Sequence, residues 1–182
     1  MPLEPKNPQE IIQLLKQMEQ YNLNNAAPLP LDDDVKGKWS GIGFRMGSYH
    51  FVIAMGFVIE VMKFPPVSQV PGSKKWVRGI ANVRGNLLPV FDLQSFLNNA
   101  VTQIKRETRV LFIAKDELNA GLIVDEVYGM KYFDQMNFKP DLGYDAQWKG
   151  YYQGGYTLEG ENWIVFNIQH LIENQDFLNV AN

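Results

Sequence analysis

The chain contains no cysteine among its 182 residues, so disulfide bonds and thiol chemistry are excluded. It has only two histidines, His50 and His170, which lie far apart in the sequence and do not have the spacing of metal ligands. We therefore expect neither a metal site nor a cofactor.

The chain also lacks an excess of positive charge and any long apolar run. It has 17 Lys and Arg against 20 Asp and Glu, a net charge of -3, whereas proteins that bind nucleic acids are usually basic. No segment approaches the roughly 20 apolar residues of a membrane span. The amino terminus lacks the charged-then-apolar order of a signal peptide. We expect a cytoplasmic protein that neither binds nucleic acid nor inserts into a membrane.

Signatures of catalysis are missing as well. None of the serines stands in a Gly-x-Ser-x-Gly elbow. The glycine-rich stretch 150–155 lacks the Gly-Lys-Ser/Thr ending of a phosphate-binding loop. These absences favour a binding protein over an enzyme.

Residues 1–37 differ in character from the rest and are predicted to form a separate extension. Asn7, Pro8 and Glu10 have the order of a helix cap, first turn and capping box. The apolar residues that follow at helical spacing are Ile11, Leu14, Leu15 and Met18. A proline-containing linker, 26–31, and an acidic run, Asp32 to Asp34, complete the extension. Its helix either packs back on the same protein or binds a partner.

Residues 38–182 are predicted to form an all-β domain. Apolar residues alternate with others over 42–46, and Gly47-Ser48 provides a hairpin turn. Further short strands recur every eight to twelve residues between turn signals, which is typical of a barrel or sandwich. A short helix or turn over 93–97, with Asp92 as its cap, and a terminal helix over 168–180 are the helical exceptions.

The most distinctive segment is 76–93, in which two Arg-Gly pairs flank a short apolar stretch. The second pair, Arg84-Gly85, precedes Asn86 and a further apolar strand. A strand, a tight turn and a second strand make a rigid edge that can expose one charged side chain. Such an edge suits a docking surface.

This segment and four other motifs, in this order, resemble the CheW family of chemotaxis coupling proteins over about residues 39–177. The five motifs are Val58-Ile59-Glu60-Val61, Val70-Pro71-Gly72, Gly79-Ile80-Ala81-Asn82-Val83-Arg84-Gly85, Pro89-Val90-Phe91-Asp92-Leu93 and Ile123-Val124-Asp125-Glu126-Val127. The extension and the opening Trp39 to Gly47 are similar to the branch of this family that serves type IV pilus chemosensory systems.

The resemblance implies two small five-stranded, SH3-like β-barrels packed on each other, here with an amino-terminal helical extension and a carboxy-terminal helix. It also implies a non-catalytic adaptor, recruited to membrane receptor arrays, that couples a methyl-accepting chemotaxis receptor to a CheA-type histidine kinase. In the pilus branch this coupling would control twitching motility. The alternatives are a small β-barrel that binds peptides outside chemosensory signalling, and an enzyme of unknown type.

The resemblance also implies a docking site for receptor or kinase. Its candidate residues are Val58, Glu60, Gly79, Ile80, Asn82, Val83, Arg84 and Gly85. In the family, a strand Glu and the turn Arg lie close together, here Glu60 and Arg84. A carboxylate can aim the arginine fork at acceptors on a partner. The alternative is an internal pair that only pins the turn.

For each of the other candidate residues, a purely structural role is an alternative to a role in binding. Val58, Ile80 and Val83 belong either to the core or to an apolar groove, and Val58 should share a strand face with Glu60. Gly79 and Gly85 are expected for backbone reasons. Asp125 is expected to tie down the turn after its strand, and the basic residues Lys74, Lys75 and Arg78 either steer an acidic partner or form a solvated face.

Overall fold

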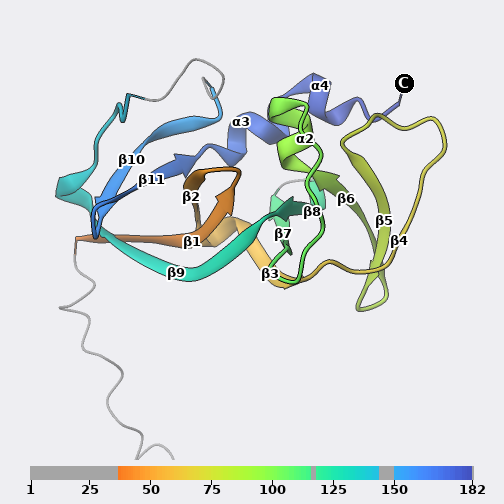
Figure 1. Ribbon diagram of the computed structural model, residues 1–182, viewed down its shortest axis with the longest axis horizontal. Helices are drawn as coiled ribbons and strands as arrows, with labels where there is room; N and C mark the ends of the chain where they lie inside the picture. Colours follow the sequence, from red (N-terminus) through yellow and green to blue (C-terminus); the bar gives the residue numbers. More distant parts are fainter. Residues whose placement is uncertain (1–36, 116–117, 144–149, 182) are drawn as a thin grey trace, which may run out of the picture. The chain divides into compact units, whose positions relative to one another are not determined.

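A computed structural model of the chain describes residues 37–115, 118–143 and 150–181. Residues 37–182 cluster as one compact unit in which most of the described residues lie in two β-sheets, drawn side by side in Figure 1. The all-β fold with two subdomains, expected from the sequence, is confirmed. The predicted amino-terminal helix and its linker lie outside the described residues.

The first sheet has five strands in the order β10-β11-β2-β1-β9. Gly47 at the β1–β2 turn, the alternation along β1 and the apolar run of β2 explain this hairpin, in which Met46 pairs with Tyr49. The strand bounds are β1 Lys38–Met46, β2 Tyr49–Ala54, β9 Glu126–Asp134, β10 Tyr152–Leu158 and β11 Glu161–Phe166.

The second sheet has six strands in the order β3-β7-β8-β6-β5-β4. It has one strand more than expected because the two-residue β4, just after Pro65-Pro66, pairs with the edge of β5. The strand bounds are β3 Val58–Lys63, β4 Val67–Ser68, β5 Val77–Val83, β6 Asn86–Asp92, β7 Arg109–Lys115 and β8 Leu118–Val124.

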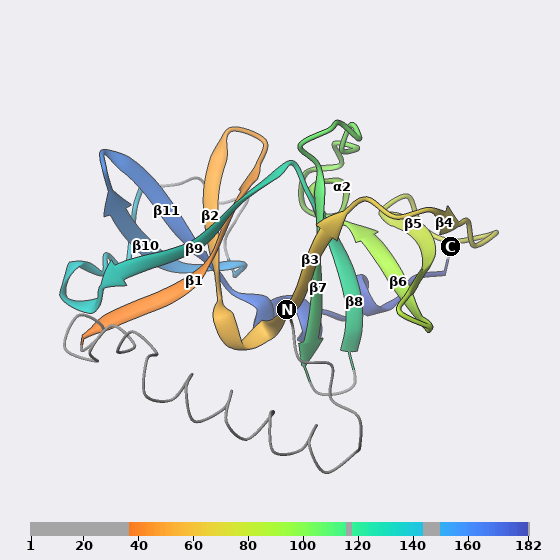
Figure 2. The same ribbon diagram turned by 90° about the horizontal axis from the view of Figure 1, so that it is seen from below.

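Three of the short helices, η2, α2 and η3, connect strands, whereas α3 and α4 follow the last strand, β11. Figure 2 shows the two sheets and α2 from below. Their bounds are η2 Met55–Phe57, α2 Leu93–Asn98, η3 Gln135–Asn137, α3 Ile168–Glu173 and α4 Gln175–Leu178. The helix predicted over 93–97 is confirmed as α2, and Asp92 caps it by accepting a hydrogen bond from the Ser95 N–H at 3.0 Å. Among the helices of the described residues, none is long and apolar enough to cross a membrane.

The carboxy-terminal helix differs from the prediction, because it is two short helices instead of one. The break falls at Asn174, whose backbone is extended and whose side chain accepts a hydrogen bond from the Phe177 N–H at 3.1 Å. Asparagine competes with the helix for local hydrogen bonds and favours a cap. The break directs Phe177 into the core, where it is fully buried.

The main core connects the two sheets. Phe44 and Phe51 of the first sheet stack at 5.5 Å between ring centroids, and they belong to the same buried cluster as Leu111 and Leu122 of the second sheet. Burying each such side chain contributes roughly 1.5–3 kcal/mol to folding. The two sheets are therefore held together by one continuous apolar core.

A second, smaller core lies within the second sheet and shows that this sheet curls. Met62 on β3 packs against the same buried cluster as Ala81 and Val83 on β5, although β3 and β5 are separated by three strands in the sheet order. The curl brings the β5–β6 turn close to β3. That approach creates the site described next.

Candidate functional site

The β5–β6 hairpin closes with a two-residue turn, Arg84-Gly85, between the paired residues Val83 and Asn86. Both turn residues have positive φ, 52° for Arg84 and 89° for Gly85, which is the backbone of a type I′ turn. Asn82 supports the turn, because its Oδ1 accepts a hydrogen bond from the Gly85 N–H at 2.9 Å. The left-handed conformation is unfavourable for arginine by roughly 1–2 kcal/mol, so local stability does not explain the choice of Arg84.

The curl of the second sheet brings Arg84 to Glu60 on β3. The Arg84 Nη2 lies 2.9 Å from the Glu60 Oε1, and 79% of the Arg84 side chain is exposed against 24% of the Glu60 side chain. A pair this exposed contributes only about 0–1 kcal/mol. The ion pair therefore aims the guanidinium more than it stabilises the fold, and it leaves further N–H groups of Arg84 facing solvent.

Val58 and Glu60 do not share a strand face, contrary to the expectation from alternation. A β-bulge at Ile59 shifts the register, so that Val58 pairs with Ile113 while Glu60 pairs with Phe112. Neighbouring residues of a strand point to opposite faces and paired residues share one. Val58 consequently packs on the main core, and Glu60 faces the side of the smaller core.

The remaining candidate residues divide between backbone, core and surface. At Gly79 φ is 136°, and a Cβ there would lie 2.3 Å from the Ser68 carbonyl oxygen of β4. Val83 is buried in the smaller core, whereas Ile80 is exposed. The structure therefore gathers Glu60, Asn82, Arg84 and Gly85 at the turn and places Gly79 and Ile80 nearer the start of β5.

Three exposed apolar residues near the turn were missed by sequence reasoning. Ile59 is 61% exposed and Leu87 71% exposed, and Val61 is also exposed. Leu87 pairs directly with Asn82. The doublet Leu87-Leu88 is the signal that could have found it, because in an alternating strand one of two adjacent apolar residues faces outward. These exposed apolar side chains lie on β3, which carries Glu60, and on β6, which follows the turn.

Asp92 anchors the far end of β6 and also engages Arg78. The fully buried Asp92 carboxylate accepts hydrogen bonds from the Thr102 N–H at 2.9 Å and the Thr102 hydroxyl at 2.7 Å. The Arg78 Nη1 lies 3.1 Å from the same carboxylate. Of the three basic residues proposed as a patch, Arg78 is therefore committed to an internal ion pair, which leaves Lys74 and Lys75.

Asp125 ties down a turn other than the one expected. Its Oδ2 accepts a hydrogen bond from the Gly47 N–H at 2.7 Å and lies 3.4 Å from the Arg45 guanidinium. Gly47 belongs to the β1–β2 turn. Asp125 thus fixes a hairpin of the first sheet from the junction between β8 and β9.

The fold and the site define a two-sheet β protein that displays a rigid, charged hairpin beside exposed apolar side chains. In the described part of the chain, no cluster of His, Cys, Asp and Glu side chains is placed to hold a metal ion.

Comparison with protein families assigns residues 40–176 to the CheW-like domain. The chain belongs to this family, as its motifs indicated.

Two relatives and one solved structure define the similarity further. The chain is 42% identical over 170 residues to Protein PilI of Pseudomonas aeruginosa, covering 93% of this chain and 95% of that protein. It is 34% identical over 85 residues to chemotaxis protein CheW of Bacillus subtilis, covering 47% of this chain and 54% of that protein. The crystal structure of the scaffolding protein TtCheW from Thermoanaerobacter tengcongensis matches with a TM-score of 0.69 at 21% identity, covering 79% of this chain and 99% of the other. This last similarity supports the fold.

Proposed function

We propose that the chain is a non-catalytic adaptor that couples a methyl-accepting chemotaxis receptor to a CheA-type histidine kinase. Its long similarity to PilI supports a role in type IV pilus twitching motility. The partners would then be a PilJ-like receptor and a ChpA-like kinase, and the protein would act in the cytoplasm at membrane receptor arrays.

The observation that carries this proposal is the β5–β6 turn. Arg84 occupies a backbone conformation that disfavours it, is largely exposed and is aimed by Glu60. A preorganised arginine fork can bind a carboxylate or carbonyl group of a partner in a fixed geometry. We assign contact with the partner to Glu60, Asn82, Arg84 and Ile80.

The other candidate residues support the shape of this surface. Gly79 and Gly85 permit the backbone path, while Val58 and Val83 hold β3 and β5 on their cores. The exposed Leu87 and Ile59 extend the surface, because an amphipathic helix of a receptor needs apolar contacts beside a polar anchor.

Co-sedimentation with membranes that carry the receptor, with kinase added, tests the proposal. The unaltered chain is expected to pellet with receptor and kinase, whereas Arg84→Ala should lose receptor binding while its melting temperature stays within a few degrees. Arg106→Ala is the matched control, because Arg106 is an exposed arginine of the loop before β7, away from the turn. Equal pelleting of Arg84→Ala and the unaltered chain would contradict the docking role.

A further inference from the structure

A cluster of basic residues lies at one end of the second sheet, where β3 ends and β7 begins (Figure 2). Lys63 is the last residue of β3, and Arg109, the first residue of β7, pairs with it in register. Lys105 and Arg106 belong to the loop just before β7. Arg109 is half-buried and the other three residues are exposed. We call these four residues the basic patch.

The basic patch is distinct from the β5–β6 turn. Lys63 follows Glu60 by three residues on β3, so the two side chains point to opposite faces of the sheet. Glu60 faces the smaller core and reaches Arg84. A partner that is held by Lys63 therefore need not contact Arg84.

The positive charges of the patch are unpaired within the part of the chain that the structure describes. Three of the five arginines lie within 3.4 Å of a carboxylate, namely Arg45, Arg78 and Arg84. Arg106 and Arg109 do not, and the two lysines of the patch form no ion pair with a described residue either. The chain as a whole carries a net charge of -3. The excess of positive charge is therefore local to this end of the sheet.

The side chains of Lys63 and Arg109 repel each other. Paired residues of antiparallel strands share a face, and like charges directly opposite each other destabilise a sheet. Stability therefore does not explain the pair. A carboxylate placed between the two cations would accept hydrogen bonds from both of them.

The loop before β7 holds the patch in a fixed shape. The N–H of the buried Thr108 donates to the Lys105 carbonyl oxygen at 3.2 Å, and its hydroxyl accepts from the Lys105 N–H at 2.8 Å. The Arg109 Nη1 donates to the carbonyl oxygens of Arg106 at 2.8 Å and of Thr108 at 2.9 Å. These bonds fix the Arg109 guanidinium, while its Nη2 has no acceptor among the described residues. A surface that is ordered beforehand binds a partner at a lower entropic cost.

Exposed apolar side chains lie in the same loop. Val101 is 59% exposed and Ile104 is 41% exposed, and Ile104 directly precedes Lys105. Thr102, between them, is buried and anchored to the Asp92 carboxylate. A free inorganic anion would use only the charges of this surface. A peptide with both acidic and apolar side chains would use the apolar residues as well, which favours a protein segment as the occupant.

We propose that the basic patch docks an acidic segment of a partner protein, in which carboxylates alternate with apolar side chains. One carboxylate of the segment lies between Lys63 and Arg109, and a second meets Lys105 or Arg106. An apolar side chain between the two packs on Ile104. Attraction between the opposite charges speeds association and orients the segment. This contact is additional to the one proposed at the β5–β6 turn.

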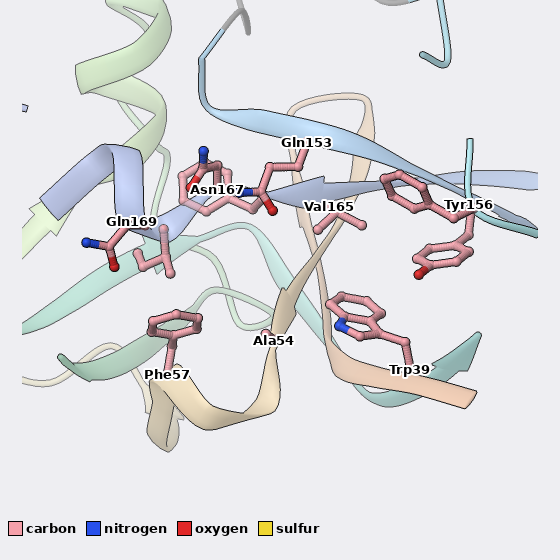
Figure 3. A pocket seen from close by; sticks show the side chains of 11 residues that line it. Trp39, Ala54, Phe57, Gln153, Tyr156, Val165, Asn167 and Gln169 are labelled. Atoms are coloured by element: carbon pink, nitrogen blue, oxygen red, sulfur yellow. The ribbon is translucent and has the colours of Figure 1, made fainter. Parts of the chain in front are cut away.

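Titration of the full ¹⁵N-labelled chain with an acetylated Glu-Leu-Glu-Leu-Glu peptide, followed by NMR at low salt, tests the proposal. We expect the amide resonances of Lys63 and Arg109 to shift and saturate, and the affinity to fall as salt is added. The Trp39 indole resonance should stay in place, because Trp39 lines a pocket of the first sheet (Figure 3). A Gln-Leu-Gln-Leu-Gln peptide keeps the apolar side chains without the charges and should cause no saturable shift.

The variant Lys63→Glu gives two readouts. It should weaken binding of the acidic peptide about tenfold. It should also raise the melting temperature, because a like-charge pair across β3 and β7 becomes an opposite-charge pair. Lys75→Glu is the matched control, since it makes the same charge change at an exposed lysine of the loop before β5, and it should change binding far less.

Equal weakening by the substitutions at Lys63 and Lys75 would overturn the proposal, and so would a lower melting temperature of Lys63→Glu. Equal shifts with the glutamine peptide or with inorganic phosphate would also overturn it, as would saturable binding of a thymidine hexanucleotide without binding of the acidic peptide. Arg84→Ala should bind the acidic peptide as the unaltered chain does. Arg106→Ala should bind it several-fold more weakly and still pellet with the receptor, so the two proposals can fail independently.

Discussion

Arg84 is the residue at which stability and the proposed docking role make opposite demands. In a type I′ turn, asparagine adopts the left-handed backbone more readily than arginine. We expect Arg84→Asn to raise the free energy of unfolding by up to about 1 kcal/mol, because backbone strain is relieved while an exposed ion pair is lost. Thermal denaturation measures the change, and co-sedimentation should show that receptor binding is lost. A melting temperature several degrees lower would show instead that the Glu60 pair is a structural necessity.

Asp92 is the residue at which the fold depends on a buried charge. The Asp92 carboxylate accepts from Ser95, Thr102 and Arg78. Asp92→Asn replaces one acceptor oxygen with an amide N–H₂ group, which would face these donors and cannot accept from them. Breaking a buried charged network of this kind costs about 3–5 kcal/mol, and urea denaturation monitored by circular dichroism should detect the loss. The control is Asp134→Asn, because Asp134 caps η3 at the surface. It should cost no more than about 0.5 kcal/mol, because asparagine caps a helix about as well as aspartate, and comparable losses for the two variants would argue against the Asp92 network.

At the scale of the element, the β5–β6 hairpin contains two glycines with different roles. A Cβ at Gly79 would collide with the Ser68 carbonyl, whereas one at Gly85 would meet no atom within 4 Å. We expect Gly79→Ala to destabilise the protein by about 2 kcal/mol or more and to detach β4, while Gly85→Ala costs only the strain of about 1 kcal/mol. Thermal melting compares them, and hydrogen exchange at Ala81, which pairs with β4, reports on the detachment. The reverse order of stability would contradict this account.

Prediction from the sequence succeeded for those structural elements that nearby residues determine. Glycine turns and alternation located the hairpins, and the capping role of Asp92 followed from its place before an apolar run. The rest required tertiary information. The bulge at Ile59 leaves no mark in the sequence, because a single inserted residue only shifts the alternation. The break at Asn174 depends on where Phe177 finds room in the core. The proximity of Glu60 and Arg84 was implied by family resemblance alone, and its cause is the curl of the second sheet.

At the scale of the whole molecule, the shared core predicts that the two sheets unfold together. Leu122→Ala in β8 should cost about 2–5 kcal/mol, and the loss should appear equally in tryptophan fluorescence and in far-UV circular dichroism during urea denaturation. Trp39 and Trp163 lie in the first sheet, and Trp76 directly precedes β5 of the second, so fluorescence samples both sheets. Two separate transitions would show that each sheet folds alone.

The strand order has a consequence for the chain as it leaves the ribosome. The second sheet is built from one continuous stretch, β3 to β8, which is complete once Val124 has emerged. The first sheet needs β1 and β2 from before that stretch and β9 to β11 from after it. During synthesis β1 and β2 have no β9 and β11 to pair with until the intervening sheet has emerged. Pairing across such a long sequence separation is slow. The second sheet, with the Arg84 turn, can therefore assemble first, and the first sheet last.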